Sequence, residues 1–166
     1  DEKNKIENYI PQLQIAFENA KFTDKAEKWL GCQLPSELFT VTFVTSVEGG
    51  AEAIDISQSQ DVFGIERGFE DAFYFIVHEF IIYLLMNVLA NENAFKTLDT
   101  WEATEGLAEY YLKKIMGNIR FKEHRKYVEY YENCEKKMPL SPVELYRQAL
   151  KDAAILKHNE RGFALT

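Results

Sequence analysis

The feature that most constrains the fold of this chain is a long apolar stretch, residues 73–90, that contains an ionisable pair, His78 and Glu79. The stretch is long enough to suggest a membrane-spanning helix, which needs about 20 mostly apolar residues. However, an ionisable pair at the centre of a bilayer is costly, and no basic cluster flanks the segment. We therefore expect residues 69–89 to form a helix that is buried in a globular core, with no membrane span in the given chain.

Composition and charge limit what the chain can bind. With 166 residues, 46% of them hydrophobic and 28% charged, it fits one globular domain, residues 1–166. It carries 27 acidic and 19 basic residues, a net charge of −8. A phosphate backbone is repelled by that charge, so nucleic acid is not an expected partner, and an anionic membrane surface is disfavoured for the same reason.

The N-terminal third combines helical and strand patterns. Residues 5–30 have apolar positions at three- and four-residue steps, which predicts helices. Residues 38–45 are rich in β-branched and aromatic residues and alternate, as a strand does, and residues 51–57 alternate again. Gly49 and Gly50 lie between these two segments and predict a turn. We therefore expect a hairpin or a neighbouring pair of strands.

The remainder is predicted to be helical. Helices are expected at residues 101–116, 121–136 and 142–157. Ser141 and Glu144 form a capping-box pattern at the start of the last of these. The predicted class is therefore α+β, a small N-terminal β-sheet packed by a mostly helical remainder.

The residues with the chemistry of a site lie on two of these helices. A histidine next to a glutamate is costly to bury among Phe, Ile, Val and Leu without partners. Ile82 is four residues beyond His78 and shares its face, while Glu79 points about 100° around the helix. On the next helix, Glu105 and Glu109 also share a face. If the two helices pack together, Glu105 can approach His78, and Glu109 can orient the imidazole from behind.

In the gluzincin branch of zinc metallopeptidases, a helix with H-E-x-x-H is followed by a helix with W-x-x-E-G-x-A. The two helical segments around His78 and Glu105 resemble these motifs. The resemblance covers residues 38–116 and implies a zincin-like fold. It implies that His78 is the first zinc ligand, Glu105 the third ligand and Glu79 the general base. Glu109 corresponds to the carboxylate that supports a ligand.

The resemblance also implies a substrate-binding strand. In the family, an edge strand holds an extended peptide by strand addition. The corresponding residues here are Ala51, Glu52, Ala53 and Ile54. Active members often close the cleft with an additional C-terminal subdomain, for which only the helical part at residues 121–166 is available, so the expected cleft is shallow.

Two positions depart from the family pattern. Trp101 stands one residue too early, which leaves its role open. Ile82 occupies the position of the second histidine, and isoleucine cannot bind zinc, whereas catalytic zinc normally has three protein ligands and a water. The other histidines, His124 and His158, are expected at the surface.

Two functions follow from these residues. The first is a peptidase-like domain that has lost zinc and proteolysis, needs no cofactor, and binds a peptide or protein. The second is an active zinc-dependent metallopeptidase in which His78, Glu105 and an unidentified third ligand hold the metal and Glu79 activates its water. An apolar residue at a ligand position favours the first.

Other features remain structural or open. Gly106 inside a helix costs stability and suggests close packing, and the tyrosines at 110, 111, 127, 130 and 131 are expected to pack at helical spacing. Cys32 and Cys134 are either free thiols or one disulfide. The sequence opens at Asp1 with no Met and no apolar leader stretch. Either an artificial boundary of the given segment or a removed leader would explain this, and a removed leader would place the chain in a secreted or cell-envelope setting. The compartment and the oligomeric state stay open.

Overall fold

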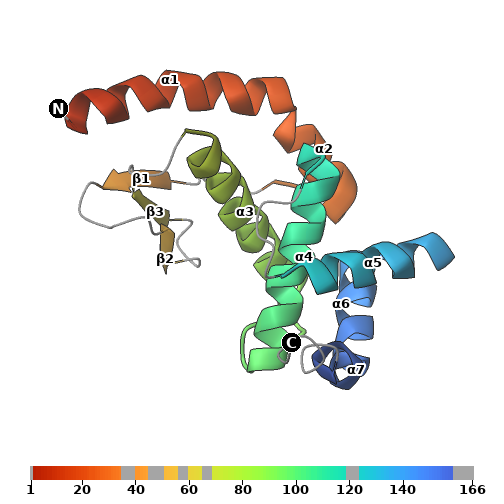
Figure 1. Ribbon diagram of the computed structural model, residues 1–166. Coiled ribbons are helices and arrows are strands. Elements are labelled where there is room, and N and C mark those ends of the chain that lie inside the picture. The colour runs from red at the N-terminus through yellow and green to blue at the C-terminus, as the bar shows by residue number, and fades with distance from the viewer. Residues whose placement is uncertain are drawn as a thin grey trace, which may run out of the picture. The chain divides into compact units, whose positions relative to one another are not determined.

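The structure is a computed structural model that describes residues 2–34, 40–44, 51–55, 60–64, 69–118 and 124–158 (Figure 1). Residue contacts divide the chain into two compact units, Asp1–Leu84 and Leu85–Thr166. The two units are described in turn. The expectation of a single domain over residues 1–166 stays a prediction.

The first unit begins with two helices, α1 (Glu2–Ala20) and α2 (Phe22–Leu30). The predicted helical region at residues 5–30 is thus broken once, at Lys21, whose φ of 47° lies in the left-handed region. Pro11 lies inside α1 and does not end it. α2 ends at Gly31, whose positive φ of 66° lets its N–H bond back to the carbonyl of Glu27.

Three five-residue strands follow: β1 (Thr40–Val44), β2 (Ala51–Asp55) and β3 (Gln60–Gly64). Their order in the sheet is β1-β3-β2, with β1 parallel and β2 antiparallel to β3. The expected pairing of the first two strands is therefore wrong, because β3 lies between them. β3 begins with Gln60 and Asp61, which are poor strand formers, so its pattern did not predict a strand. The expected turn at residues 49–50 lies outside the described residues.

The apolar helix is α3 (Phe69–Val88), which confirms the helix expected at residues 69–89. Its acidic first turn, Glu70 and Asp71, suits the positive end of the helix dipole. Of the described helices, α3 alone is long and apolar enough to cross a membrane, and 56% of its apolar window is buried within the protein. The core helix of a soluble protein has the same length and composition.

The second unit contains α4 (Leu98–Met116), α5 (Arg125–Lys137), α6 (Pro142–Lys151) and α7 (Ala153–His158). α4 packs against α5 and α6, and α5 packs against α6. The capping box expected at Ser141 and Glu144 is confirmed at the start of α6. α4 begins three residues before the expected start because Thr97 and Thr100 cap it there.

The predicted α+β, zincin-like class is wrong, because the described chain is mostly helical. The helices at the N-terminus were expected, but the strands are limited to three described segments of five residues each. The alternation at residues 38–45 and 51–57 indicates a local preference for extended backbone, and such a preference does not decide the fold class. The class is decided by the long helices, to which the side chains described as buried belong almost entirely.

Candidate functional site

His78 and Glu79 lie in the middle of α3, within the first unit. The His78 side chain is only 4% exposed, and its neighbours Val77 and Ile81 are fully buried. Its Nδ1 atom is buried and forms no hydrogen bond with the described residues, although the residue makes other interactions. Glu79 is half-buried. The histidine therefore lies among buried apolar residues of α3.

Ile82, at the position of the missing ligand, is a core residue. It is 2% exposed and lies one helical turn after His78, between the fully buried Ile81 and Leu85. An aliphatic side chain therefore occupies the position on α3 from which the second zinc ligand would point. These residues do not fit zinc, because one of the three protein ligands that such a site normally uses is replaced by an aliphatic side chain.

Glu105 and Glu109 lie on α4, in the second unit. Glu109 is fully buried, and Glu105 is half-buried. A buried carboxylate is costly unless it is hydrogen-bonded, and Glu109 does make interactions within the protein. The two glutamates share a face of the helix, as their spacing predicted.

The structure places the two pairs of residues in different units, so each pair is described by itself. The expected approach of Glu105 to His78 stays a prediction. Among the described residues, no three His, Cys, Asp or Glu side chains are grouped as a metal site requires.

Gly106 has a packing role. A Cβ atom built on this glycine would lie 2.2 Å from Cβ and 2.7 Å from Cγ of Tyr127, which belongs to α5. Such distances are far below van der Waals contact, so only glycine lets the two helices approach this closely. This confirms the close packing expected at Gly106. It also explains the glycine without any reference to a catalytic motif.

The tyrosines of the second unit form its core, as expected. Tyr110, Tyr111, Tyr127 and Tyr131 are buried. The hydroxyl of Tyr131 donates to the carbonyl oxygen of Ala103 at 2.8 Å, which joins α5 to α4. Burial raises the pKa of Tyr131 well above its ordinary value. The phenol stays neutral and acts as a structural donor.

Ion pairs surround this core. Tyr110 donates to Glu135 at 2.5 Å, and Lys114 binds the same carboxylate. Burial opposes the charged form of Glu135, but these two hydrogen bonds outweigh it and lower the pKa of Glu135. Lys113 forms a second ion pair, with Glu132.

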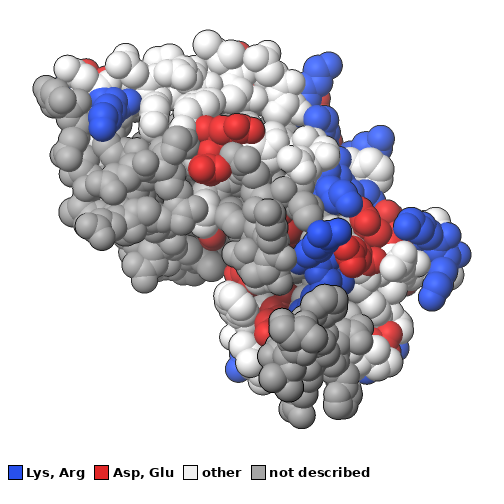
Figure 2. Space-filling view, in the orientation of Figure 1, with Lys and Arg blue, Asp and Glu red and all other residues white. Residues whose placement is uncertain are grey.

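Positive and negative side chains are mixed over α5 on the face shown in Figure 2. Arg125 pairs with Glu129 at 2.8 Å and Lys126 lies 3.9 Å from Glu102. On this face α5 therefore shows no single-sign surface of the kind that nucleic-acid binding uses.

The predicted substrate-binding residues, Ala51, Glu52, Ala53 and Ile54, belong to β2. β2 is the last strand in the sheet order and pairs with β3 through Ala51–Phe63 and Glu52–Val62. The pairing is irregular between Glu52 and Asp55. The strand thus lies at an edge of the described sheet, which is the position that strand addition requires.

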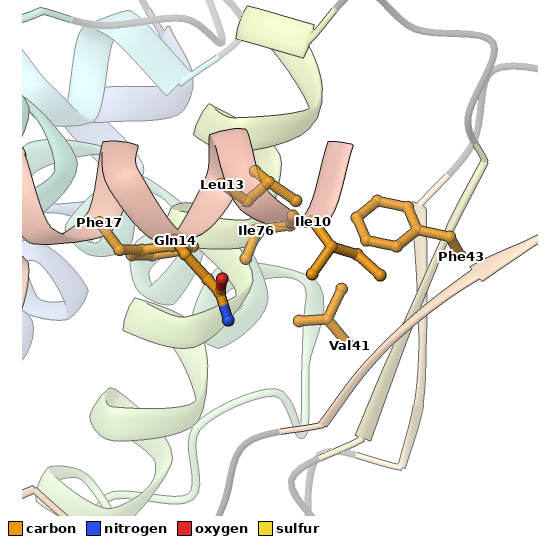
Figure 3. Close-up of a pocket in the computed structure, with 7 residues that line it drawn as sticks. All are labelled: Ile10, Leu13, Gln14, Phe17, Val41, Phe43 and Ile76. Atoms are coloured by element: carbon orange, nitrogen blue, oxygen red, sulfur yellow. The ribbon is translucent and has the colours of Figure 1, made fainter. Parts of the chain in front are cut away.

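The sequence patterns did not reveal an apolar cavity of about 370 Å³ in the first unit (Figure 3). α1 contributes one wall, and β1 and α3 contribute the others. The apolar lining residues are Ile10, Leu13, Phe17, Val41, Phe43 and Ile76, and Gln14 is the polar one. The spacing of positions 10, 13 and 17 did predict an apolar helix face. That spacing could not show that the opposing surfaces leave space.

No protein-family model, no curated protein and no solved structure matches this chain. The resemblance to gluzincin peptidases therefore rests on the residues quoted above.

Proposed function

We propose that this protein is a non-catalytic domain that binds an extended peptide or protein segment and carries the remains of a zinc-peptidase motif. The observation that carries the proposal is the burial of Ile82. Its side chain is part of the α3 core, so it cannot be exchanged for a water or a distant ligand without repacking that core. A site with two protein ligands would hold zinc poorly.

The polar remnants are consistent with this proposal. His78 and Glu109 are buried polar residues, and such groups are normally retained where they have a partner or a function. Glu79 without zinc has no metal-bound water to deprotonate. The chemistry left to these residues is hydrogen bonding.

The position of β2 supports binding of an extended segment. Among the described strands, β3 is the only partner of β2, so the other edge of β2 carries backbone donors and acceptors that an extended chain can match. Main-chain pairing of this kind needs no catalytic residue and tolerates many sequences.

Metal content tests the loss of catalysis. Protein purified without chelator is expected to hold well under one equivalent of zinc by mass spectrometry, because only two ligands of the motif remain. His78→Ala is the matched variant and should leave that small value unchanged. A stoichiometric zinc signal that His78→Ala abolishes would show that the site is a working metal centre.

Peptide binding tests the second half of the proposal. The full chain is immobilised and used to select from a displayed library of random decapeptides, and the affinities of the selected peptides are measured in solution. Adjacent N–H groups of a strand point to opposite edges. Of Glu52→Pro and Ala53→Pro, one therefore removes an outward donor and should lose peptide binding with the circular dichroism unchanged. Retained binding in both folded variants, or no selected peptide at all, contradicts strand addition at β2.

A further inference from the structure

The cavity in the first unit is bounded by three elements, α1, β1 and α3. The side chains of Ile10, Val41 and Phe43 face one another across it, as Figure 3 shows. Leu13 and Ile76 are buried and form its floor, whereas Ile10 is 46% exposed. The cavity therefore has an apolar base at Leu13 and Ile76 and is open toward solvent, where Ile10 and Gln14 are exposed.

Aromatic contacts fix α1 on α3 at both ends of this space. The ring centroids of Tyr9 and Phe69 lie 5.9 Å apart, and those of Phe17 and Phe73 lie 5.0 Å apart, both in edge-to-face geometry. Tyr9 and Phe17 are about two helical turns apart, with Leu13 between them. Since α1 is a continuous helix between the two contacts, it cannot bend inward to fill the space. The cavity is preformed.

The size of the cavity suits a small organic molecule. Protein interiors leave few voids larger than a water molecule, whereas ligand pockets begin at about 300 Å³. An apolar cavity of about 150 Å³ is enough to bind benzene. The volume here, about 370 Å³, is more than twice that.

The lining determines the chemistry of the ligand. Gln14 supplies the one hydrogen-bonding side chain among the described lining residues. Because a buried water needs two to four polar partners, this lining suits an apolar molecule better than ordered water. No charged side chain is present in that described lining, so it offers no counter-charge to an ionised ligand. The net charge of −8 disfavours a carboxylate further.

We propose that this cavity binds a small, uncharged hydrophobic compound with a single hydrogen-bonding group. The hydrocarbon part fills the space above Leu13 and Ile76, and the Gln14 amide pairs with the polar group at the opening. None of the described lining residues belongs to β2, so the test of this proposal does not use the peptide-binding variants.

The test uses the full chain and the neutral dye N-phenyl-1-naphthylamine, which fluoresces in apolar sites. We expect saturable binding of one dye per chain and displacement by 1-octanol but not by octanoate. Leu13→Trp fills the cavity from its floor, and Ile10→Trp fills it from the opening. Each folded variant should weaken dye binding by at least about tenfold.

Ile15→Trp is the matched control, because Ile15 lies on the same helix but is exposed and does not line the cavity. It should keep the wild-type affinity. Absence of saturable binding, wild-type affinity in the folded filling variants, an equal loss in Ile15→Trp, or displacement by octanoate as strong as by 1-octanol would each overturn the proposal. Ile10→Trp, at an exposed position, decides the matter if Leu13→Trp does not fold.

The polar group has its own test. Gln14→Leu should weaken competition by benzyl alcohol about fivefold, the effect of one hydrogen bond, and leave competition by toluene unchanged. An equal change for both compounds would overturn the assignment of Gln14 as the polar partner.

Discussion

Gly106→Ala is expected to destabilise the second unit by steric overlap between α4 and α5. The added Cβ would lie 2.2 Å from Cβ and 2.7 Å from Cγ of Tyr127. These atoms are close to the α5 backbone, so they cannot move away without shifting the helix. Overpacking of this kind costs about 1–3 kcal/mol, and the short distances place it near the upper end. Alanine regains about 1 kcal/mol of helix propensity, which leaves a net loss of about 2 kcal/mol.

The assay is urea unfolding followed by circular dichroism at 222 nm. A loss of about 2 kcal/mol corresponds to a melting temperature lower by about 4–8 °C for a chain of this length. The double variant Gly106→Ala with Tyr127→Gly provides the control. Once both overlapping atoms are gone, the alanine should stabilise the chain by about 1 kcal/mol relative to Tyr127→Gly alone. If Gly106→Ala is neutral or stabilising in the wild-type background, the helices do not approach as described, and the packing explanation of the glycine fails.

Three further results are expected. Ile82→His places a polar ring in the α3 core and should lower the free energy of unfolding by about 1–3 kcal/mol without metal. Zinc uptake by this variant, measured by mass spectrometry, would support the geometry of the zinc-peptidase motif, whereas a folded variant that binds no zinc would contradict the motif alignment. Tyr131→Phe removes a buried hydrogen bond to Ala103 and should lower the free energy of unfolding by about 1 kcal/mol in urea titrations, so an unchanged value would refute a stabilising role for that bond. The pKa of Glu135 is lower in the folded than in the unfolded state, so its contribution is present above the unfolded pKa and is lost as the pH falls through the folded pKa. Acid unfolding should therefore be less steep in Lys114→Met than in the wild type, and identical acid profiles would contradict this account of the ion pair.

The candidate site illustrates what a sequence motif can and cannot establish. The residues His78, Glu79 and Ile82 occupy one helix, as predicted, because their surroundings are apolar enough to require a buried helix. The glycine in the second segment was expected to mark close packing, and Tyr127 is its neighbour. The motif itself could not name that neighbour, because residues 106 and 127 are brought together by the packing of α4 on α5.

For the sheet, two strands were predicted correctly but their pairing was not. Residues 40–44 and 51–55 form strands within the expected segments. β1 is rich in β-branched and aromatic residues, which favour extended backbone, whereas β2 was predicted from its alternation. Their partner β3 contains Val62 and Phe63 but begins with Gln60 and Asp61, and it pairs on both sides. Strand pairing is a tertiary interaction. The local preferences of the residues therefore did not predict β3, and they did not exclude the incorrect direct pairing of β1 with β2.

The sequence by itself determined the long helices, their capping residues and the apolar α3, because periodicity and capping act between residues close along the chain. It also determined that Ile82 cannot bind a metal, which follows from the chemistry of one side chain. Only the tertiary structure decided the mostly helical class, the order β1-β3-β2, the contact of Gly106 with Tyr127 and the cavity under α1. Each of these depends on which surfaces meet across long separations in sequence, and local preference carries no information about that.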